Sequence, residues 1–187
     1  MTQKLNIAIA GVAGRMGRQI ASAALAGSHT ITGATEAAGS DALDSDVGVL
    51  AGAQALGLKP TTSIADAIKG ADCWIDFTRP AATLNALEAL IEAGVKSAVI
   101  GTTGFSDDEE EAIKKASAKI AIMKSGNYSL GVNLLAALTK MAAARLGADW
   151  DIEILETHHR RKVDAPSGTA LLLGDAAADG RGSQRAL

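Results

Sequence analysis

The densest group of chemically capable side chains lies in the segment 156–170. It contains two adjacent histidines, His158 and His159, and a lysine shortly after them, Lys162. A histidine can deliver a proton near neutral pH, and a lysine offers a positive charge and three N–H donors to a carboxylate. A cationic run of this kind is more often a solvated surface. Metal binding is disfavoured, because adjacent histidines rarely converge on one ion.

The same segment continues into Pro-Ser-Gly-Thr, which precedes an Ala/Leu-rich stretch and predicts the start of a helix. The first N–H groups of a helix have no partner within it, and they attract anions. We therefore expect Ser167, Gly168 and Thr169 to bind a carboxylate of a substrate whose proton donor is a nearby histidine.

A second candidate site is a glycine-rich turn after a short apolar segment. It consists of Gly11, Val12, Ala13, Gly14, Arg15, Met16 and Gly17. The spacing is GxxGxxG, whereas dinucleotide-binding turns usually read GxGxxG. The context of a strand before and a helix after still favours a pyrophosphate site, to which Arg15 could add charge. The alternative is a plain strand-to-helix turn.

Glu36 ends the next predicted strand, where an acidic side chain can accept hydrogen bonds from both ribose hydroxyls of a dinucleotide. The same charge would repel a 2′-phosphate. Ala37 follows, so no neighbouring arginine in the sequence offsets that repulsion. We therefore expect NADH to be preferred, with NADPH left open. The alternative for Glu36 is an ordinary solvated glutamate.

The segments around these candidates alternate between strand and helix up to about residue 125. Strands are predicted over 5–10, 30–34, 73–77, 96–100 and 120–123, and helices over 14–26, 66–69, 80–92 and 107–118. Residues 37–60 are expected to be mostly loop. This alternation predicts an α/β fold with a Rossmann-like, doubly wound parallel sheet, whose ligands bind beyond the carboxyl ends of the strands.

The alternation of strands and helices ends at about residue 125. This change predicts a dinucleotide-binding domain over 1–125 and a second domain over 126–187. Residues 127–133 are expected to be a link, followed by a helix to about residue 146. Apolar and acidic residues alternate over 152–156, which is typical of a half-buried strand. The second domain is therefore expected to be α+β.

Composition excludes several classes of protein. The chain has 187 residues, a net charge of −3 and one cysteine, Cys73. It lacks the basic surface of nucleic-acid binders and the apolar runs of membrane spans. It also shows no secretory signal, so a cytoplasmic protein is expected. Only 3% of its residues are aromatic, which leaves little material for base stacking.

From residue 7 to about residue 180, the sequence resembles the dihydrodipicolinate reductase (4-hydroxy-tetrahydrodipicolinate reductase) family. The resemblance rests on five blocks in order: 11–17, Asp76-Phe77-Thr78-Arg79-Pro80, Gly101-Thr102-Thr103-Gly104-Phe105, 127–133 and, most specific, 156–170. It implies a nicotinamide-dependent reduction of a cyclic unsaturated dicarboxylate in lysine and diaminopimelate biosynthesis.

The resemblance also implies roles for individual residues. His158 matches the acid/base, Lys162 the second catalytic residue and His159 a substrate contact. Gly168 and Thr169 match the carboxylate-binding turn, and Glu36 matches the ribose acid. Positions 11–16 match the pyrophosphate loop. The nicotinamide side is matched by Gly101, Thr102 and Thr103 and by Ser125, Gly126, Asn127 and Tyr128.

Two departures from the family pattern matter. Ala37 stands where several members have an arginine, which weakens the case for 2′-phosphate recognition. Members also continue well past a Gly-Arg-Gly like that at 180–182, so we expect an incomplete second domain, and a homotetramer only if that domain is complete. Two alternatives stay open: another NAD-dependent dicarboxylate oxidoreductase, and a non-catalytic dinucleotide-binding fragment.

Overall fold

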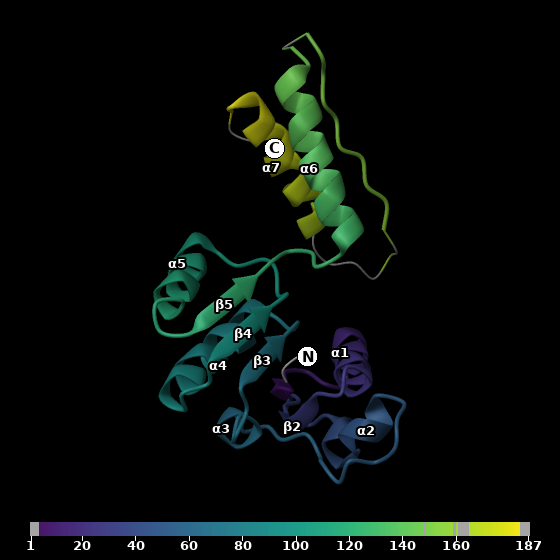
Figure 1. The fold of residues 1–187 in the computed structure, drawn as a ribbon, viewed down its shortest axis with the longest axis vertical. Coiled ribbons are helices and arrows are strands. Elements are labelled where there is room, and N and C mark those ends of the chain that lie inside the picture. The colour runs from purple at the N-terminus through teal and green to yellow at the C-terminus, as the bar shows by residue number, and fades with distance from the viewer. Residues whose placement is uncertain (1–3, 148, 159, 161–164, 184–187) are drawn as a thin grey trace. The chain divides into compact units, whose positions relative to one another are not determined.

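A computed structural model of the chain describes residues 4–147, 149–158, 160 and 165–183. The chain divides into two compact units, Met1–Lys124 and Ser125–Leu187 (Figure 1). His159 and Lys162, both predicted site residues, lie outside the described residues.

The first unit is built on a five-stranded parallel sheet with the order β2-β1-β3-β4-β5. The strands are β1 (Asn6–Ile9), β2 (Thr30–Ala34), β3 (Cys73–Asp76), β4 (Ser97–Ile100) and β5 (Ala121–Lys124). The chain moves from β1 outward to β2 and then returns to the other side of β1 as β3. The order therefore reverses between β1 and β3, which is where doubly wound folds bind their ligands. The predicted Rossmann-like sheet is confirmed.

Helices cover both faces of this sheet, as the alternating pattern predicts. The longer ones are α1 (Arg15–Ala26), α4 (Pro80–Glu92) and α5 (Asp107–Ala116), and α3 (Ile64–Ala67) is a single turn. Local signals set their ends: Gly27 follows α1, proline begins α4, and Ser106 forms a capping box with Glu109 at α5.

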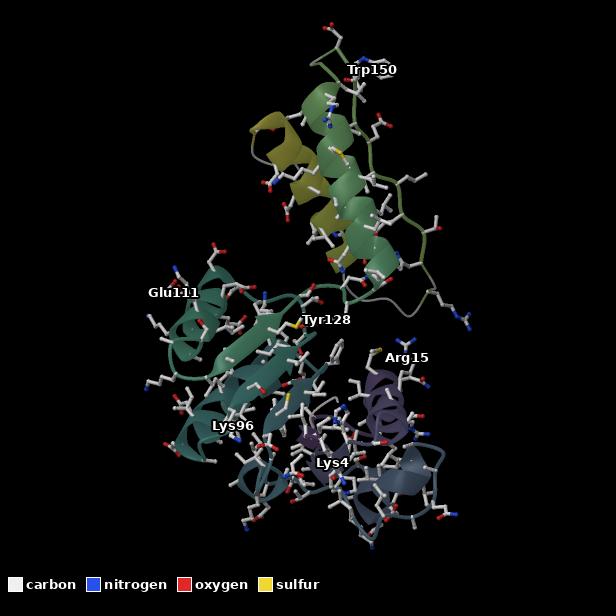
Figure 2. All side chains as sticks on the ribbon, viewed as in Figure 1. Lys4, Arg15, Lys96, Glu111, Tyr128 and Trp150 are labelled. Atoms are coloured by element: carbon white, nitrogen blue, oxygen red, sulfur yellow. The ribbon has the colours of Figure 1, made fainter. Side chains whose placement is uncertain are left out.

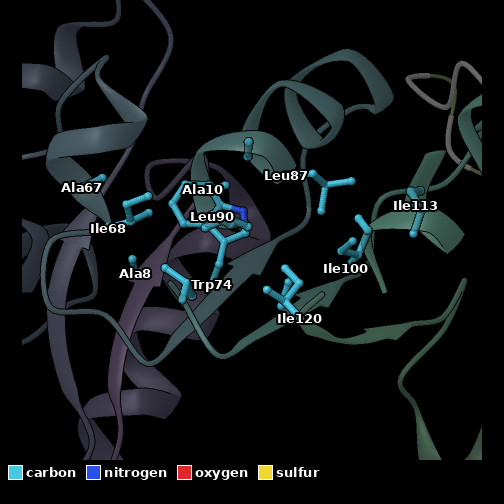
Figure 3. Close-up of a cluster of buried hydrophobic side chains, with 14 residues drawn as sticks. Ala8, Ala10, Ala67, Ile68, Trp74, Leu87, Leu90, Ile100, Ile113 and Ile120 are labelled. Atoms are coloured by element: carbon cyan, nitrogen blue, oxygen red, sulfur yellow. The ribbon is translucent and has the colours of Figure 1, made fainter. Parts of the chain in front are cut away.

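Two buried clusters fill the space between the sheet and the helices. Ile7 and Ile9 of β1 belong to the cluster on the α1 side, whereas Ala8 and Ala10 belong to the cluster around Trp74 (Figure 3). Alternate residues of a strand point to opposite faces, so β1 contributes to both cores. The small side chains of Ala8 and Ala10 leave room for the buried Trp74 ring.

Residues 37–60 are mostly loop, as expected, with two short helical exceptions. The segment contains a 3₁₀ turn, η1 (Asp41–Asp44), and a short helix, α2 (Val47–Leu50). Asp46 organises it, because its carboxylate accepts hydrogen bonds from the N–H groups of Gly48, Val49, Leu56 and Leu58. The hydrogen bonds to this one carboxylate order a segment whose sequence has no helical or strand periodicity.

The second unit contains two helices that pack on each other, α6 (Leu130–Arg145) and α7 (Gly168–Arg181). Gly180 permits the close approach, since a Cβ there would lie 2.3 Å from the Lys140 carbonyl oxygen. The expected link over 127–133 is wrong in its second half. Ser129 caps the helix by accepting from the N–H of Val132, so α6 begins at Leu130.

The strand expected over 152–156 is not formed in the described residues. A strand exists only through hydrogen bonds to a neighbouring strand, and the described part of the chain supplies none for this segment. Its apolar side chains are consequently open to solvent, with Leu155 94% exposed. Across the described residues, no helix is both long and apolar enough to cross a membrane.

Candidate functional site

The glycine-rich turn leaves β1 and enters α1 with its backbone closely packed. Gly11 has a φ of +58°, in the region that favours glycine, and a Cβ there would lie 2.9 Å from the Thr78 methyl. A Cβ at Gly17 would lie 2.2 Å from the Gly11 carbonyl oxygen. Both positions therefore require glycine for the helix to begin this close to the strand.

The start of α1 offers donors to an anion. Gly14 occupies the N-cap without a side-chain cap, and no described residue accepts a hydrogen bond from the N–H of Arg15 or Met16. Both side chains are exposed at the first turn, with Arg15 visible at the end of α1 (Figure 2). Uncapped N–H groups, the helix dipole and one cation together suit a phosphate.

Two predicted members of this turn make contacts with the protein itself. The Val12 side chain is fully buried in the core, and its N–H donates to the Thr35 carbonyl at 3.2 Å. The N–H of Ala13 donates to the Glu36 carboxylate at 2.7 Å. Val12 therefore supports the turn, and Ala13 links the turn to Glu36.

A pocket of about 250 Å³ opens at the carboxyl ends of β1, β2 and β3, where the strand order reverses. It is lined by Ala10, Gly11, Thr35, Glu36, Ala37, Thr62, Ile64, Trp74, Asp76, Thr78, Arg79, Ala82 and Asn85. The glycine-rich turn and the predicted ribose acid thus share one cavity.

Arg79 lines this pocket and is not among the residues predicted from the sequence. It lies far from Glu36 in the chain, at the N-cap of α4. The sequence carried a weak signal, because the turn after β3 belongs to the same sheet edge as the glycine-rich turn. The structure therefore supplies the cation that the sequence lacks at Ala37.

The turn after β4 presents its backbone and not the side chain of Thr102. Thr102 is 3% exposed, and its hydroxyl contacts the N–H of Thr78 at 3.0 Å and the hydroxyl of Thr83 at 3.1 Å. Gly101 packs against the Phe77 ring, which a Cβ would overlap at 2.1 Å. Thr103, in contrast, is exposed.

In the second unit, Asn127 brings two predicted segments together. Its side-chain amide donates to the Thr169 hydroxyl at 3.0 Å, and its backbone N–H and carbonyl both bond to the Ser125 hydroxyl. Asn133 donates to the Asn127 carbonyl at 3.0 Å. The segment containing Ser125, Gly126, Asn127 and Tyr128 is therefore attached to the start of α7.

The start of α7 is hydrogen-bonded to Glu156, whose carboxylate lies near the predicted proton donor, His158. Ser167 is buried and caps the helix by accepting from the N–H of Ala170 at 3.1 Å. Its own N–H donates to Glu156 Oε1 at 2.8 Å, and its hydroxyl donates to Glu156 Oε2. The same Oε2 lies 3.5 Å from Nδ1 of His158.

Glu156 is thus a candidate functional residue that the sequence reasoning missed. Its carboxylate joins the helix start, a candidate anion site, to His158, a candidate acid. The alternating pattern of 152–156 had pointed instead to a strand residue. Among the described residues, no group of three or more His, Cys, Asp or Glu side chains could hold a metal ion.

Comparison with known proteins shows the family to which the chain belongs. A family model for the N-terminal part of dihydrodipicolinate reductase matches residues 5–128, and one for the C-terminal part matches residues 131–186. The chain belongs to the dihydrodipicolinate reductase family. This family consists of nicotinamide-dinucleotide-dependent reductases, so the chain is related to oxidoreductases of lysine biosynthesis.

Several family members are close in sequence. The 4-hydroxy-tetrahydrodipicolinate reductase of Parvibaculum lavamentivorans is 52% identical over 97% of this chain and 68% of its own length. That of Rhodopseudomonas palustris strain BisB5 is 49% identical over 95% of this chain and 65% of its own length. The chain thus spans about two thirds of the length of these relatives.

Among solved structures, the dipicolinate-bound dihydrodipicolinate reductase from Paenisporosarcina sp. TG-14 is similar in fold. The TM-score is 0.73, with coverage of 97% of this chain and 68% of that chain. At 24% sequence identity this similarity supports the fold alone.

Proposed function

We propose that the chain carries out the reaction for which its relatives are named, the reduction of 4-hydroxy-tetrahydrodipicolinate to tetrahydrodipicolinate with NADH or NADPH. The observation that carries the proposal is the carboxylate of Glu156, which bonds to Ser167 at the start of α7 and lies 3.5 Å from His158. The substrate is a dicarboxylate whose reduction consumes a proton. It therefore needs a site for a carboxylate, such as a helix start, and a proton donor nearby.

The first unit fits a dinucleotide at two points. Glycine at positions 11 and 17 lets α1 begin close to β1, and the first N–H groups of α1 are uncapped, so they can face a pyrophosphate. Glu36, on the neighbouring strand end, faces the same pocket and can accept from ribose hydroxyls. The nicotinamide end would meet Gly101, Thr102 and Thr103 and the segment 125–128.

In the second unit, the N–H groups of Gly168 and Thr169 would hold one substrate carboxylate. His159 and Lys162, outside the described residues, would hold the other and offset developing negative charge. His158 would donate the proton, while Glu156 holds its Nδ1 side so that Nε2 faces the substrate.

The overall reaction balances with these groups. When bound, NADH or NADPH would supply the hydride, while a proton would be consumed and the 4-hydroxyl group would leave as water. His158 is the group that can give this proton and then regain one from solvent. The protein therefore needs to orient the substrate, neutralise its carboxylates and donate a proton. None of these tasks requires a metal.

We propose that NADH is the preferred cofactor and that NADPH also binds. Glu36 is held beside the turn and would repel a 2′-phosphate, and Ala37 offers no charge against that repulsion. Arg79, exposed in the same pocket, provides a cation that can partly offset it.

We further propose that copies of the chain associate through the second unit, as a family-like homotetramer. Its surface exposes large apolar side chains on α6 and on the segment after it. They are Leu134, Leu135, Leu138, Met141, Trp150, Ile152, Ile154 and Leu155. Exposed apolar surface of this extent is typical of an interface. Mass in solution, measured by light scattering, tests this.

The function is tested by following NADH oxidation by the purified chain with freshly generated substrate, alongside NADH binding in its absence. Turnover that depends on both chain and substrate would support the proposal. Binding of NADH without any turnover would favour the second candidate, a non-catalytic dinucleotide-binding chain. Turnover only with a different dicarboxylate would favour another oxidoreductase.

A further inference from the structure

A fully buried carboxylate, Asp76, ends β3 at the edge of the cofactor pocket and takes no part in the contacts proposed above. Its Oδ1 accepts from the Thr78 hydroxyl at 2.6 Å, the Thr78 N–H at 3.0 Å and the Thr102 hydroxyl at 3.3 Å. Its Oδ2 lies 3.5 Å from Nε1 of Trp74. A carboxylate removed from water binds such donors strongly.

Thr102 is therefore held from several sides. Its hydroxyl donates to Asp76, and it also accepts from the N–H of Thr78 and the hydroxyl of Thr83, which lies in α4. The flanking residues, Gly101 and Thr103, are the ones expected to meet the nicotinamide. Among these contacts the Asp76 carboxylate is the group that accepts from the Thr102 hydroxyl, so it helps to fix the position of that turn.

Thr78 provides a second connection, toward the glycine-rich turn, because its methyl group occupies the space beside Gly11. The turn has its own supports, however. The N–H of Gly14 donates to the Gly11 carbonyl at 3.0 Å, and the N–H of Val12 donates to Thr35 at 3.2 Å. Loss of Asp76 should therefore displace the turn after β4 more than the glycine-rich turn.

We propose that Asp76 is the positioning residue for the nicotinamide end of the cofactor, acting through Thr102 on the turn 101–103. This rests on the proposed function, since it assumes that this turn meets the nicotinamide. The effect is indirect, because Asp76 is buried and its described partners are protein groups.

Two ligands separate the two ends of the site. ADP-ribose contains the adenosine, pyrophosphate and second ribose but no nicotinamide, whereas NADH contains all of them. The full chain would be titrated with each ligand for the wild type, Thr102→Val, Asp76→Asn and Asp76→Ala. Cys73→Ala, in the same strand and buried, is the control for a general loss of packing.

Thr102→Val should weaken NADH about tenfold, the effect of one lost positioning hydrogen bond, and leave ADP-ribose within about twofold of wild type. Asp76→Ala should weaken NADH binding at least as strongly. The NADH affinity of Asp76→Asn should lie between those of the wild type and Asp76→Ala, because its amide oxygen can still accept from Thr78 and Thr102. Cys73→Ala should change neither affinity.

The two hypotheses fail in different ways. If the wild type binds neither ligand, the proposed function is wrong. If the wild type binds NADH more tightly than ADP-ribose but Thr102→Val leaves NADH unchanged, only the role of Asp76 is wrong. Equal weakening of both ligands in folded variants would also contradict it. Should Asp76→Ala not fold, Thr102→Val and Asp76→Asn still decide.

Discussion

The carboxylate of Glu36 accepts a hydrogen bond of 2.7 Å from the backbone N–H of Ala13, across two different strand ends. Its other oxygen accepts from the N–H of Ala37 at 3.2 Å. The acid is therefore anchored to the glycine-rich turn by the protein's own backbone. A carboxylate oriented in this way keeps lone pairs for ribose hydroxyls and needs little rearrangement when they arrive.

Replacing Glu36 tests this role. Glu36→Ala should weaken NADH about tenfold or more through lost ribose hydrogen bonds. It should weaken NADPH much less, because the repulsion of the 2′-phosphate disappears with the charge. Fluorescence titration with both cofactors measures the two affinities, and Glu92→Ala, an exposed acid at the end of α4, serves as the control. Equal losses for NADH and NADPH would remove Glu36 from the ribose.

The opposite preference is expected at Arg79. Arg79→Ala should weaken NADPH by about two- to fivefold, the scale of an exposed charge pair, and NADH by less. The difference should shrink as salt is added, because ions screen an exposed charge. Titrations at low and high ionic strength would measure it. A loss confined to NADH would show that Arg79 does not face the 2′ position.

The proton donor is tested by removing its acidity while keeping its shape. His158→Gln should lower kcat by about two to four orders of magnitude, the usual contribution of a general acid. Lys162→Ala should lower turnover by orders of magnitude too. NADH affinity should stay near wild type in both. His29→Gln, in the first unit, should leave turnover unchanged. Loss of NADH binding in either site variant would contradict separate cofactor and substrate sites.

Glu156→Gln distinguishes two roles of Glu156, the orientation of His158 and the support of the start of α7. The glutamine can still accept from the N–H of Ser167, so α7 should form, but the charge beside His158 is lost. We expect kcat to fall at least about tenfold, because the imidazole loses the carboxylate that orients it, with KM for the substrate within about twofold. Glu153→Gln, exposed in the same segment, is the matched control. A raised KM with unchanged kcat would place Glu156 in substrate binding only.

Acid should remove the contribution of Asp46 to stability. Backbone hydrogen bonds, chiefly from Leu56, hold the pKa of Asp46 below its usual range. A depressed pKa means that this contribution is complete above the unfolded value of about 3.9 and is lost as pH falls through the lower folded value. Asp46→Asn should therefore lower Tm at neutral pH, and the difference from wild type should vanish in strong acid. Asp44→Asn, largely exposed, should show neither effect.

Several elements could be read from local pattern. The apolar run at β1, the glycines around α1, the proline that begins α4 and the charge gradient of α5 act within one or two turns of chain. Their signals are therefore visible without a tertiary structure. The helix start at Ser167 belongs with them, since a capping serine acts on its own backbone.

Other features had no local signal. Asp46 orders a segment that composition describes as loop, and 152–156 has a strand pattern without a partner strand among the described residues. Arg79 reaches the pocket that Gly11 and Glu36 line only because β3 lies next to β1. Each outcome depends on what another part of the chain provides.

The sequence by itself therefore determined the class of fold, the alternation of elements and the residue types that can do the chemistry. Only the tertiary structure decided which of them meet: Glu36 with Ala13, Asp76 with Thr102, and Glu156 with Ser167. Helix and strand preferences are short-range properties of the backbone. A hydrogen bond between distant residues depends instead on strand order and packing, which no short window of sequence contains.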